Sequence, residues 1–337
     1  MKIAHAREQH APAGAPFRLF AAADIDAARW LDLEVARRRA ISVHAQLAHN
    51  SVLFRQPMTT LDDHLGRGLR VETLAEILEH FEQRDTDDDA LAATPDLSFG
   101  PPILRPTSLR DFYAFERHVS TVWSRRDQSV PEAWYRLAIF YFSNVSEIRG
   151  PDEPVWAPDA SKELDFELEL CALIDTPVKD LVASRGEEAI GGYMLMNDWS
   201  ARDLQRDETA VRLGPAKGKD FATTIGPWLT TPDELADVRA GKGYELPATA
   251  TVNDTVIGQG RWSDIHYSFG EMVERACADV RLVPGDLIGS GTVGSCCLLE
   301  SREDSGLGRY LQAGDRVSLH VDRLGELNTQ IVGRPTP

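Results

Sequence analysis

The sequence predicts an α+β protein in which a small, helical N-terminal region precedes a larger, strand-rich domain. Three observations support this class. Residues 164–170, L-D-F-E-L-E-L, alternate apolar and acidic side chains with the period of two that is typical of a half-buried strand. Residues 248–257 and 314–332 each have the pattern of two strands joined by a turn. Apolar side chains recur at helical spacing in the first part of the chain, and 337 residues allow two domains.

The N-terminal region, residues 1–98, is expected to contain two helices. The first is predicted over residues 27–47 with Asp26 as its cap, and its apolar side is formed by Trp30, Leu31, Leu33 and Val35. The second is predicted over residues 71–81, where apolar side chains follow helical spacing at Val71, Leu74, Ile77, Leu78 and Phe81. The run 84–96 is acidic and poor in apolar residues, which indicates a linker.

The second domain, residues 99–337, begins with an extended proline-rich segment and is then rich in strands. The predicted hairpin turns at N-D, residues 253–254. A P-G turn leads into a strand over residues 284–293. Helices are expected over residues 197–206 and 268–277.

Composition argues against several classes of function. The net charge of −17 and the pI near 5.0 argue against binding to nucleic-acid phosphates or to an anionic membrane surface. The chain has no apolar run long enough for a transmembrane helix, and its first residues lack the apolar core of a signal peptide. Its four cysteines show no C-x-x-C spacing, so we expect reduced, buried thiols in a cytoplasmic protein.

The acidic strand raises the central question, because Asp165, Glu167 and Glu169 are predicted to share one face with no cation between them. A solvated edge strand is one explanation. However, acidic residues are poor strand formers, and next-but-one neighbours on a strand face repel each other. We therefore expect a positive partner. Lys162 and Lys179 are the nearest lysines outside the strand, and a divalent cation would fit better.

Reactive side chains concentrate in four segments of the second domain. The segments are R-D-F-Y-A-F-E-R-H (110–118), L-D-F-E-L-E-L (164–170), M-N-D-W-S-A-R-D-L-Q (196–205) and G-K-D-F-A-T-T (218–224). Their carboxylates favour a hard cation, and His118 suits proton transfer near neutral pH. Asp198 is predicted at a helix start, with Arg202 and Gln205 on one helical face about a turn apart. Each residue also has a simpler explanation: Asp198 as a helix cap, Arg202 in a surface ion pair, His118 as a structural histidine, and Lys219 in solvent.

In combination, these motifs resemble those of the fumarylacetoacetate hydrolase family. They occur in order as D-F-Y-x-x-x-x-H, L-D-x-E-L-E, M-N-D-W-S-A-R-D-L-Q, G-K-x-F-x-T-T-I-x-P-W and P-G-D-L-x-x-S-G-T, and they span essentially the whole second domain. The co-occurrence of L-D-x-E-L-E and M-N-D-W-S-A-R-D is the most specific part. The resemblance implies that the second domain is catalytic, with a mixed β-roll or barrel-like architecture.

The resemblance also implies a site for Mg²⁺, or for Ca²⁺ or Mn²⁺. Its ligands would be four carboxylates, those of Asp111, Glu167, Glu169 and Asp198. Asp165 would then either support these ligands or be exposed to solvent.

The resemblance further implies a catalytic set. His118 would be the general base, oriented by Glu300. Lys219, with Arg202 and Gln205, would polarise a substrate carbonyl and stabilise a carbanion leaving group. Substrate contacts are implied for Tyr113, Tyr141 and Thr292. An arginine that the family places beyond the histidine has no direct match, although Arg125 and Arg126 lie nearby.

These observations predict a metal-dependent hydrolase that cleaves a carbon–carbon bond in a small anionic β-diketo acid of the acylpyruvate or fumarylacetoacetate type. The alternative is decarboxylation of an oxo acid, keto–enol isomerisation or hydration at the same site. A catalytically silent cation-binding scaffold is the third possibility. The resemblance further implies a homodimer and a role in the breakdown of aromatic compounds.

Overall fold

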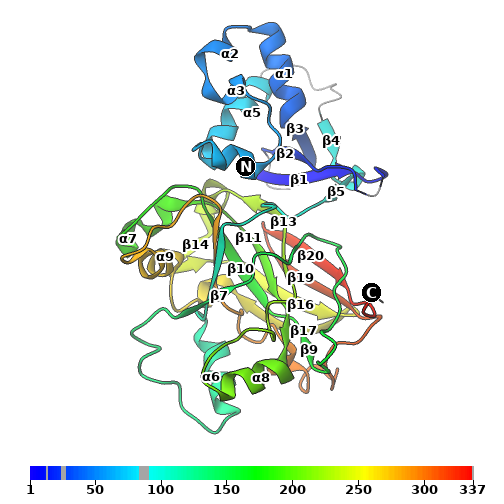
Figure 1. Cartoon of the computed structure of the whole chain (residues 1–337), viewed down its shortest axis with the longest axis vertical. Helices are drawn as coiled ribbons and strands as arrows, with labels where there is room; N and C mark the ends of the chain where they lie inside the picture. Colours follow the sequence, from blue (N-terminus) through cyan, green and yellow to red (C-terminus); the bar gives the residue numbers. More distant parts are fainter. Residues whose placement is uncertain (13, 24–27, 83–90, 336–337) are drawn as a thin grey trace.

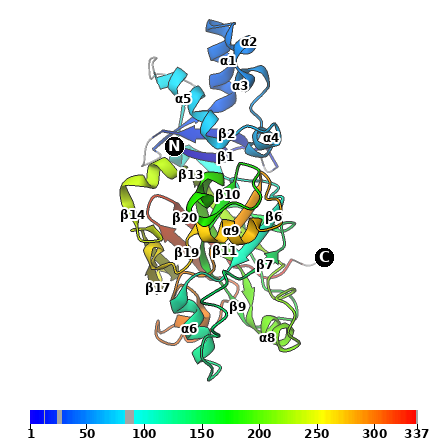
Figure 2. The same cartoon turned by 90° about the vertical axis from the view of Figure 1, so that its left-hand side faces the viewer.

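The structure is a computed structural model that describes the chain except residues 13, 24–27, 83–90 and 336–337. The N-terminal helices lie at one end of the long axis, and the strand-rich body forms the rest of the molecule (Figure 1). Seen from the side, the two parts lie one above the other (Figure 2). The predicted α+β class is confirmed, because mostly antiparallel strands are packed with separate helices.

One sheet of twelve strands runs through both parts of the molecule. Neighbouring strands in its main path are, in order, β4 (Leu91–Ala93), β3 (Arg29–Asp32), β2 (Arg18–Ala22), β1 (Lys2–Glu8), β13 (Thr223–Thr230), β11 (Ile190–Asp198), β10 (Leu168–Ile174), β18 (Asp286–Gly289), β6 (Ser108–Phe112) and β7 (Phe140–Ser143). Two strands lie off this path: β5 (Leu97–Phe99) pairs with β1, and β8 (Ile148–Arg149) pairs with β13. Because β1 pairs with β13, the N-terminal strands extend the sheet of the second domain. The predicted domain boundary between residues 98 and 99 therefore stays a proposal.

A second sheet of four strands packs against β11 and β13. Its order is β17 (Thr255–Arg261), β16 (Pro247–Val252), β19 (Arg316–Val321) and β20 (Gly325–Gln330). Asn253 and Asp254 form the turn between β16 and β17 with φ of 50° and 64°, the left-handed values that a tight hairpin turn requires. The predicted hairpin and the predicted C-terminal strand pair are both confirmed. Two shorter pairings complete the named strands: β9 (Leu164–Asp165) with β12 (Ser200–Ala201), and β14 (Arg239–Ala240) with β15 (Gly243–Tyr244).

The first predicted helix is wrong at its start. Residues 29–32 form β3, and the helix α1 runs from Leu33 to Val43. Its cap is Asp32, whose carboxylate accepts hydrogen bonds from the backbone N–H groups of Glu34 and Val35 at 3.0 Å each. The predicted cap, Asp26, lies outside the described residues. Pairing with β4 on one side and β2 on the other therefore overrides the helical spacing of this segment.

The second predicted helix is confirmed as the 3₁₀ turn η1 (Val71–Leu74) followed by α5 (Ala75–Glu82). Three short helices lie between α1 and η1: α2 (Leu47–Asn50), α3 (Val52–Arg55) and α4 (Leu61–Gly66). Five strands of this region, β1 to β5, were not predicted. The described part of the predicted linker, residues 91–96, forms β4 and a short 3₁₀ turn.

In the second domain the helices are α6 (Glu116–Ser124), α7 (Ala183–Gly186), α8 (Arg202–Ala210), α9 (Phe269–Cys277) and α10 (Leu298–Ser301). The helix predicted over residues 268–277 is confirmed, and Ser268 caps it in a capping box with Glu271. The helix predicted from Asn197 begins only at Arg202, because Asn197 and Asp198 pair with β13 as the end of β11.

Residues 164–170 are not a half-buried strand, as their alternation predicted. They are divided between β9 and β10, with residues 166 and 167 between the two strands, and every residue from 164 to 174 is buried. The four cysteines are free and buried, as predicted. None of the helices in the described part of the chain combines the length and the apolar character needed to cross a membrane.

His5 joins β1 to two later segments of the chain. Its ring is buried; Nδ1 lies 3.0 Å from the carbonyl oxygen of Pro101, and Nε2 accepts the Leu61 N–H at 3.0 Å. Burial lowers the pKa of His5, although the Pro101 carbonyl, Asp62 and Asp63 oppose this shift. The folded protein therefore holds His5 neutral, with the proton on Nδ1.

We expect His5→Gln to reduce the loss of stability in acid. Below the ordinary histidine pKa of about 6.5 the unfolded chain takes up a proton that the folded chain refuses, so folding stability falls by at most about 1.4 kcal/mol per pH unit. Urea unfolding at about pH 7 and about pH 5 measures this slope. The control is His320→Gln on the outer face of β19, where the side chain is 47% exposed. Equal slopes in all three proteins would contradict the prediction.

Candidate active site

A cavity of about 510 Å³ opens between β6, β7, α6 and α8. Ten of the twelve residues to which the sequence analysis assigned a role line this cavity: Asp111, Tyr113, His118, Tyr141, Glu167, Glu169, Arg202, Gln205, Lys219 and Thr292. The other two, Asp198 and Glu300, are buried behind its wall and bond to the lining residues Tyr141 and His118. The structure therefore brings all twelve residues to one place.

The strand order brings three carboxylates together. Asp111 lies on β6, Glu169 on β10 and Asp198 at the end of β11, and β18 runs between β6 and β10. Gly289 of β18 pairs with Asp111, and a Cβ atom there would lie 2.6 Å from Asp111 Oδ1 and 2.6 Å from Met196 Cε. A glycine at this position therefore leaves the space through which the Asp111 carboxylate reaches Glu169.

These three carboxylates form a group with little compensation of their charge. One oxygen from each lies within 4.8 Å of the others, and all three side chains are buried. Burial, together with the nearby Asp198 carboxylate, raises the pKa of Asp111 to about 8, and burial and the Asp111 carboxylate raise that of Glu169 well above its usual range. The Gly291 N–H donates to Glu169 Oε2 at 3.0 Å and to Asp111 Oδ1 at 3.3 Å.

The group fits a hard divalent cation. Asp198 Oδ1 is buried and has no hydrogen-bond partner among the described residues. An unpaired buried oxygen is costly, and carboxylate oxygens are the ligands that Mg²⁺, Mn²⁺ and Ca²⁺ prefer. Asp111, Glu169 and Asp198 would therefore hold the cation.

Glu167, the fourth predicted ligand, is held by two cationic side chains. Lys219 Nζ donates to Glu167 Oε2 at 2.5 Å and also to Asp198 Oδ2, and Arg202 Nη2 lies 2.8 Å from Glu167 Oε1. Burial alone would raise the pKa of Glu167, but Arg202 and Lys219 lower it below its usual range. Glu167 is therefore an ionised carboxylate beside the group of three.

Asp165 is neither exposed nor part of the cation group. Its side chain is fully buried, and its Oδ2 accepts the Arg202 Nε–H at 2.8 Å. The positive partners of the acidic segment are thus Arg202 and Lys219, which come from distant parts of the chain. Lys162 and Lys179, the nearest lysines in sequence, are exposed.

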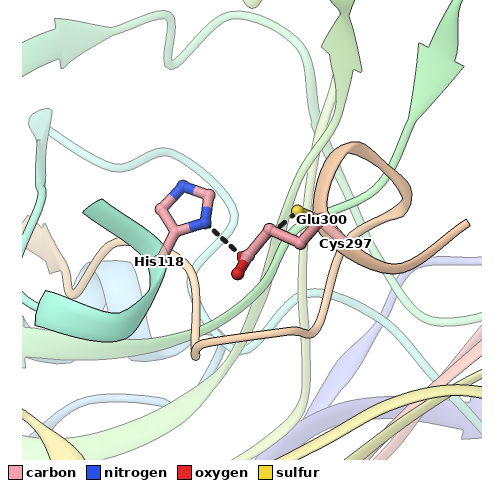
Figure 3. Close-up of side chains that lie close together, drawn as sticks. All are labelled: His118, Cys297 and Glu300. Carbon is pink, nitrogen blue, oxygen red and sulfur yellow. Dashed lines mark hydrogen bonds and ion pairs between the residues drawn. The ribbon is translucent and has the colours of Figure 1, made fainter. Parts of the chain in front are cut away.

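His118 and Glu300 form a hydrogen-bonded pair between α6 and α10 (Figure 3). His118 Nδ1 faces Glu300 Oε1, while Glu300 Oε2 accepts the Ser295 N–H at 3.0 Å. Burial would raise the pKa of Glu300, but His118 and its other donors lower it, so the carboxylate stays ionised and accepts the Nδ1 proton. This leaves His118 Nε2 without a hydrogen bond among the described residues, 4.0 Å from Glu167 Oε1. The arrangement suits a general base.

The remaining predicted residues surround these groups. The Tyr141 hydroxyl donates to Asp198 Oδ2 at 2.7 Å, and the Tyr113 ring meets the His118 ring edge to face at 5.3 Å. Gln205 Oε1 accepts from Arg202 Nη1 at 3.1 Å. Thr292 is buried in the cavity wall.

Sequence reasoning missed several contributors. The Gly291 and Ser295 N–H groups and the Cys297 thiol, which lies 3.5 Å from Glu300 Oε1, carry no side-chain pattern that predicts a role. Trp123 and Phe140, which add apolar wall, follow the spacing of ordinary core residues.

One protein family matches most of the second domain. The family described as "Fumarylacetoacetate (FAA) hydrolase C-terminal" matches residues 107–332. The chain therefore belongs to the fumarylacetoacetate hydrolase family.

Individual relatives are distant. A fumarylacetoacetase of Oryza sativa is 26% identical over 84% of this chain and 81% of its own length. A fumarylacetoacetase of Emericella nidulans is 30% identical, and that match spans only about half of either protein, 54% of each. A 2,4-didehydro-3-deoxy-L-rhamnonate hydrolase of a Sphingomonas species is 28% identical over 57% of this chain and 64% of its own.

Solved structures share the fold. A fumarylacetoacetate hydrolase from Exiguobacterium antarcticum superposes with a TM-score of 0.68 at 20% identity, covering 99% of this chain and 100% of that one. A maleylpyruvate hydrolase from Sphingobium sp. SYK-6 gives 0.65 at 18% identity, with the same coverage. A 5-carboxymethyl-2-hydroxymuconate delta-isomerase from Mycobacterium smegmatis gives 0.63 at 23% identity, covering 99% and 100%.

We expect Asp198→Asn to weaken Mn²⁺ binding by at least about tenfold, because it removes a charged oxygen donor from the group of three. Glu167→Gln should weaken it less, since both oxygens of Glu167 already bond to Lys219 and Arg202. Titration with Mn²⁺, followed by calorimetry or by the signal of free Mn²⁺, measures both affinities. A larger loss in Glu167→Gln would show that Glu167 is a primary ligand.

Proposed function

We propose that the protein is a divalent-cation-dependent hydrolase that cleaves a carbon–carbon bond in a small β-diketo acid. The observation that carries this proposal is the orientation of His118. Its Nδ1 is engaged by Glu300, and its free Nε2 lies beside Glu167 in the wall of the cavity. Such a base can take a proton from water next to a group of carboxylates that fits a cation.

The chain's own residues support the following sequence. His118 Nε2 takes a proton from water, and the resulting hydroxide adds to the substrate carbonyl carbon. The bond between that carbon and its neighbour breaks, and the electron pair leaves with the neighbouring fragment as an enolate. Lys219 and Arg202 supply the positive charge that stabilises this fragment. The imidazolium of His118 then returns the proton to the enolate carbon, which gives a carboxylic acid and a ketone.

A bound divalent cation would act as a Lewis acid toward the two oxygens of the diketo group. Asp111, Glu169 and Asp198 would hold it, and Mg²⁺, Mn²⁺ and Ca²⁺ all suit such oxygen donors. Tyr141 fixes Asp198 from the cavity side through its hydroxyl.

Arg126 is the cavity arginine that we assign to a second carboxylate of the substrate. Arg202 is paired with Asp165 and Glu167, Arg206 with Glu163, and the Arg125 Nη2 donates to the carbonyl oxygen of residue 300 at 2.8 Å. Arg126 lies over the Trp123 ring at 5.9 Å and has no ion pair among the described residues. A free guanidinium at an aromatic wall suits a carboxylate on an extended, flat substrate.

The proposed reaction is tested by a substrate panel of fumarylacetoacetate, acylpyruvates and oxaloacetate, each with Mg²⁺, with Mn²⁺ and with a chelator. Release of two fragments from a diketo acid that stops with the chelator is the expected result. Release of CO₂ alone would identify an oxo-acid decarboxylase. An isomerised or hydrated product without cleavage would identify an isomerase or a hydratase. A tightly bound cation without any turnover would point to a silent scaffold.

His118→Gln should lower kcat by at least about 100-fold, because it removes the proton acceptor while keeping a polar side chain. The Mn²⁺ affinity should stay within about threefold of the wild-type value, since His118 does not belong to the group of three carboxylates. Steady-state kinetics and Mn²⁺ titration check the two expectations separately. Near-native turnover of this variant would exclude His118 as the base.

Arg126→Ala should raise KM for a diketo acid with two carboxylates by about tenfold, which corresponds to roughly 1.4 kcal/mol. An acylpyruvate with a single carboxylate serves as the control substrate, and its KM should change little. An equal rise in KM for both substrates would place the contact of Arg126 at the carboxylate that the two share.

A further inference from the structure

Asp165 is the most completely bonded carboxylate in the interior around the cavity. Its Oδ1 accepts the backbone N–H groups of Phe166 at 2.8 Å and Leu298 at 2.7 Å. Its Oδ2 accepts the N–H of Leu299 at 2.9 Å and the Nε–H of Arg202 at 2.8 Å. Four donors from three segments of the chain thus converge on one side chain that is fully buried.

Two of these donors belong to the turn that carries Glu300. Leu298 and Leu299 are the first two residues of α10, whose own cap residue, Cys297, makes no side-chain capping bond. Asp165, which lies on β9, therefore caps the N-terminus of α10 from a distant part of the chain. A negative charge at the N-terminus of a helix is stabilising. The position of Glu300 behind His118 depends on this turn (Figure 3).

The fourth donor, Arg202, connects Asp165 to Glu167. Arg202 Nη2 lies 2.8 Å from Asp165 Oδ2 and 2.8 Å from Glu167 Oε1, so the guanidinium is fixed between two carboxylates. Arg202 is the first residue of α8, and it is 4% exposed. The same carboxylate thus holds Arg202 and the Glu300 turn in a fixed relation.

We propose that Asp165 is a positioning residue, which sets Arg202 and Glu300 relative to His118 for the reaction. This inference rests on the proposed function. A neutral Asn or Ser would be enough to cap α10, whereas a buried carboxylate carries a large desolvation cost unless a cation compensates it. A carboxylate at this position is explained by the need to satisfy α10 and Arg202 at once, because its two oxygens accept from both.

The test is Asp165→Asn, which keeps the size of the side chain and removes its charge. An amide has one acceptor oxygen, so its NH₂ group must face either the Leu298 N–H or the donors from Leu299 and Arg202. We expect kcat to fall by about 100-fold, as a small displacement of reacting groups does, with KM and Mn²⁺ affinity changed less than about threefold.

Asp175→Asn is the matched control. Asp175 is also a buried aspartate that accepts from a backbone N–H, that of Val71 at 3.0 Å, and from an arginine, Arg70, at 3.3 Å. It does not line the cavity. Both substitutions should lower the unfolding midpoint, but only Asp165→Asn should lower kcat. An equal fall in kcat for the two variants would show that Asp165 only stabilises the fold and has no specific positioning role.

A double-mutant cycle with Arg202→Lys tests the route through Arg202. If Asp165 acts by holding Arg202, adding Asp165→Asn to Arg202→Lys should lower kcat by less than about tenfold further. A full 100-fold additional loss would overturn this route.

Proton NMR, which needs no turnover, tests whether Asp165 positions Glu300. The His118 Nδ1 proton, held by Glu300, should give a strongly downfield proton resonance, assigned by its loss in His118→Gln. Asp165→Asn should shift or broaden it, and Asp175→Asn should not. An unchanged resonance in Asp165→Asn would overturn positioning of Glu300 by Asp165. If the wild-type protein has no activity on the diketo acids, only the proposed function is contradicted. The positioning of Glu300 by Asp165 can still be tested, because the resonance is measured without turnover.

Discussion

Burial of negative charge is the constraint on which the site depends. Asp111, Asp165, Glu167, Glu169 and Asp198 lie together in the interior, and two cationic side chains reach them. Lys219 and Arg202 neutralise Asp165, Glu167 and one oxygen of Asp198. Asp111, Glu169 and the second oxygen of Asp198 have no ion-pair partner among the described residues, and the raised pKa values of Asp111 and Glu169 show how costly their ionised forms are without one. Removing ions from water is costly without compensation, so these carboxylates define where a divalent cation would be most stabilising.

The sheet makes this concentration of charge possible. Its backbone hydrogen bonds fix β6, β18, β10 and β11 side by side, so Asp111, Glu169 and Asp198 cannot move apart to relieve their repulsion. Gly289 lets Asp111 reach across β18, and the Gly291 N–H contacts two of the carboxylates. A rigid backbone thus stores an unfavourable arrangement that a ligand can stabilise, as expected at functional sites.

The sequence predicts the members of this site better than the local structure that holds them. Motif order identifies twelve residues that the structure brings to one cavity, because side-chain type and spacing carry that information directly. The burial of a side chain, in contrast, depends on distant segments of the chain and cannot be predicted from the neighbouring sequence. The alternation in residues 164–170 indicated a half-buried strand, yet both faces are covered, and the partners of Asp165 and Glu167 come from residues 202, 219, 298 and 299. The same limit affects residues 29–32, where strand pairing with β4 and β2 prevails over a helical pattern of apolar residues.

Fold likeness alone does not identify the reaction, because solved structures of similar fold include proteins described as hydrolases and others described as isomerases. A group of carboxylates that binds a divalent cation can serve several reactions that pass through an enolate. What differs between cleavage by water and proton transfer within the substrate is the position of the base relative to the bond that changes. His118 is fixed at Nδ1 by Glu300, and the Glu300 turn is fixed by Asp165. If the proposed function holds, the geometry of that chain of contacts, rather than the cation group itself, would determine whether water or a substrate carbon faces Nε2.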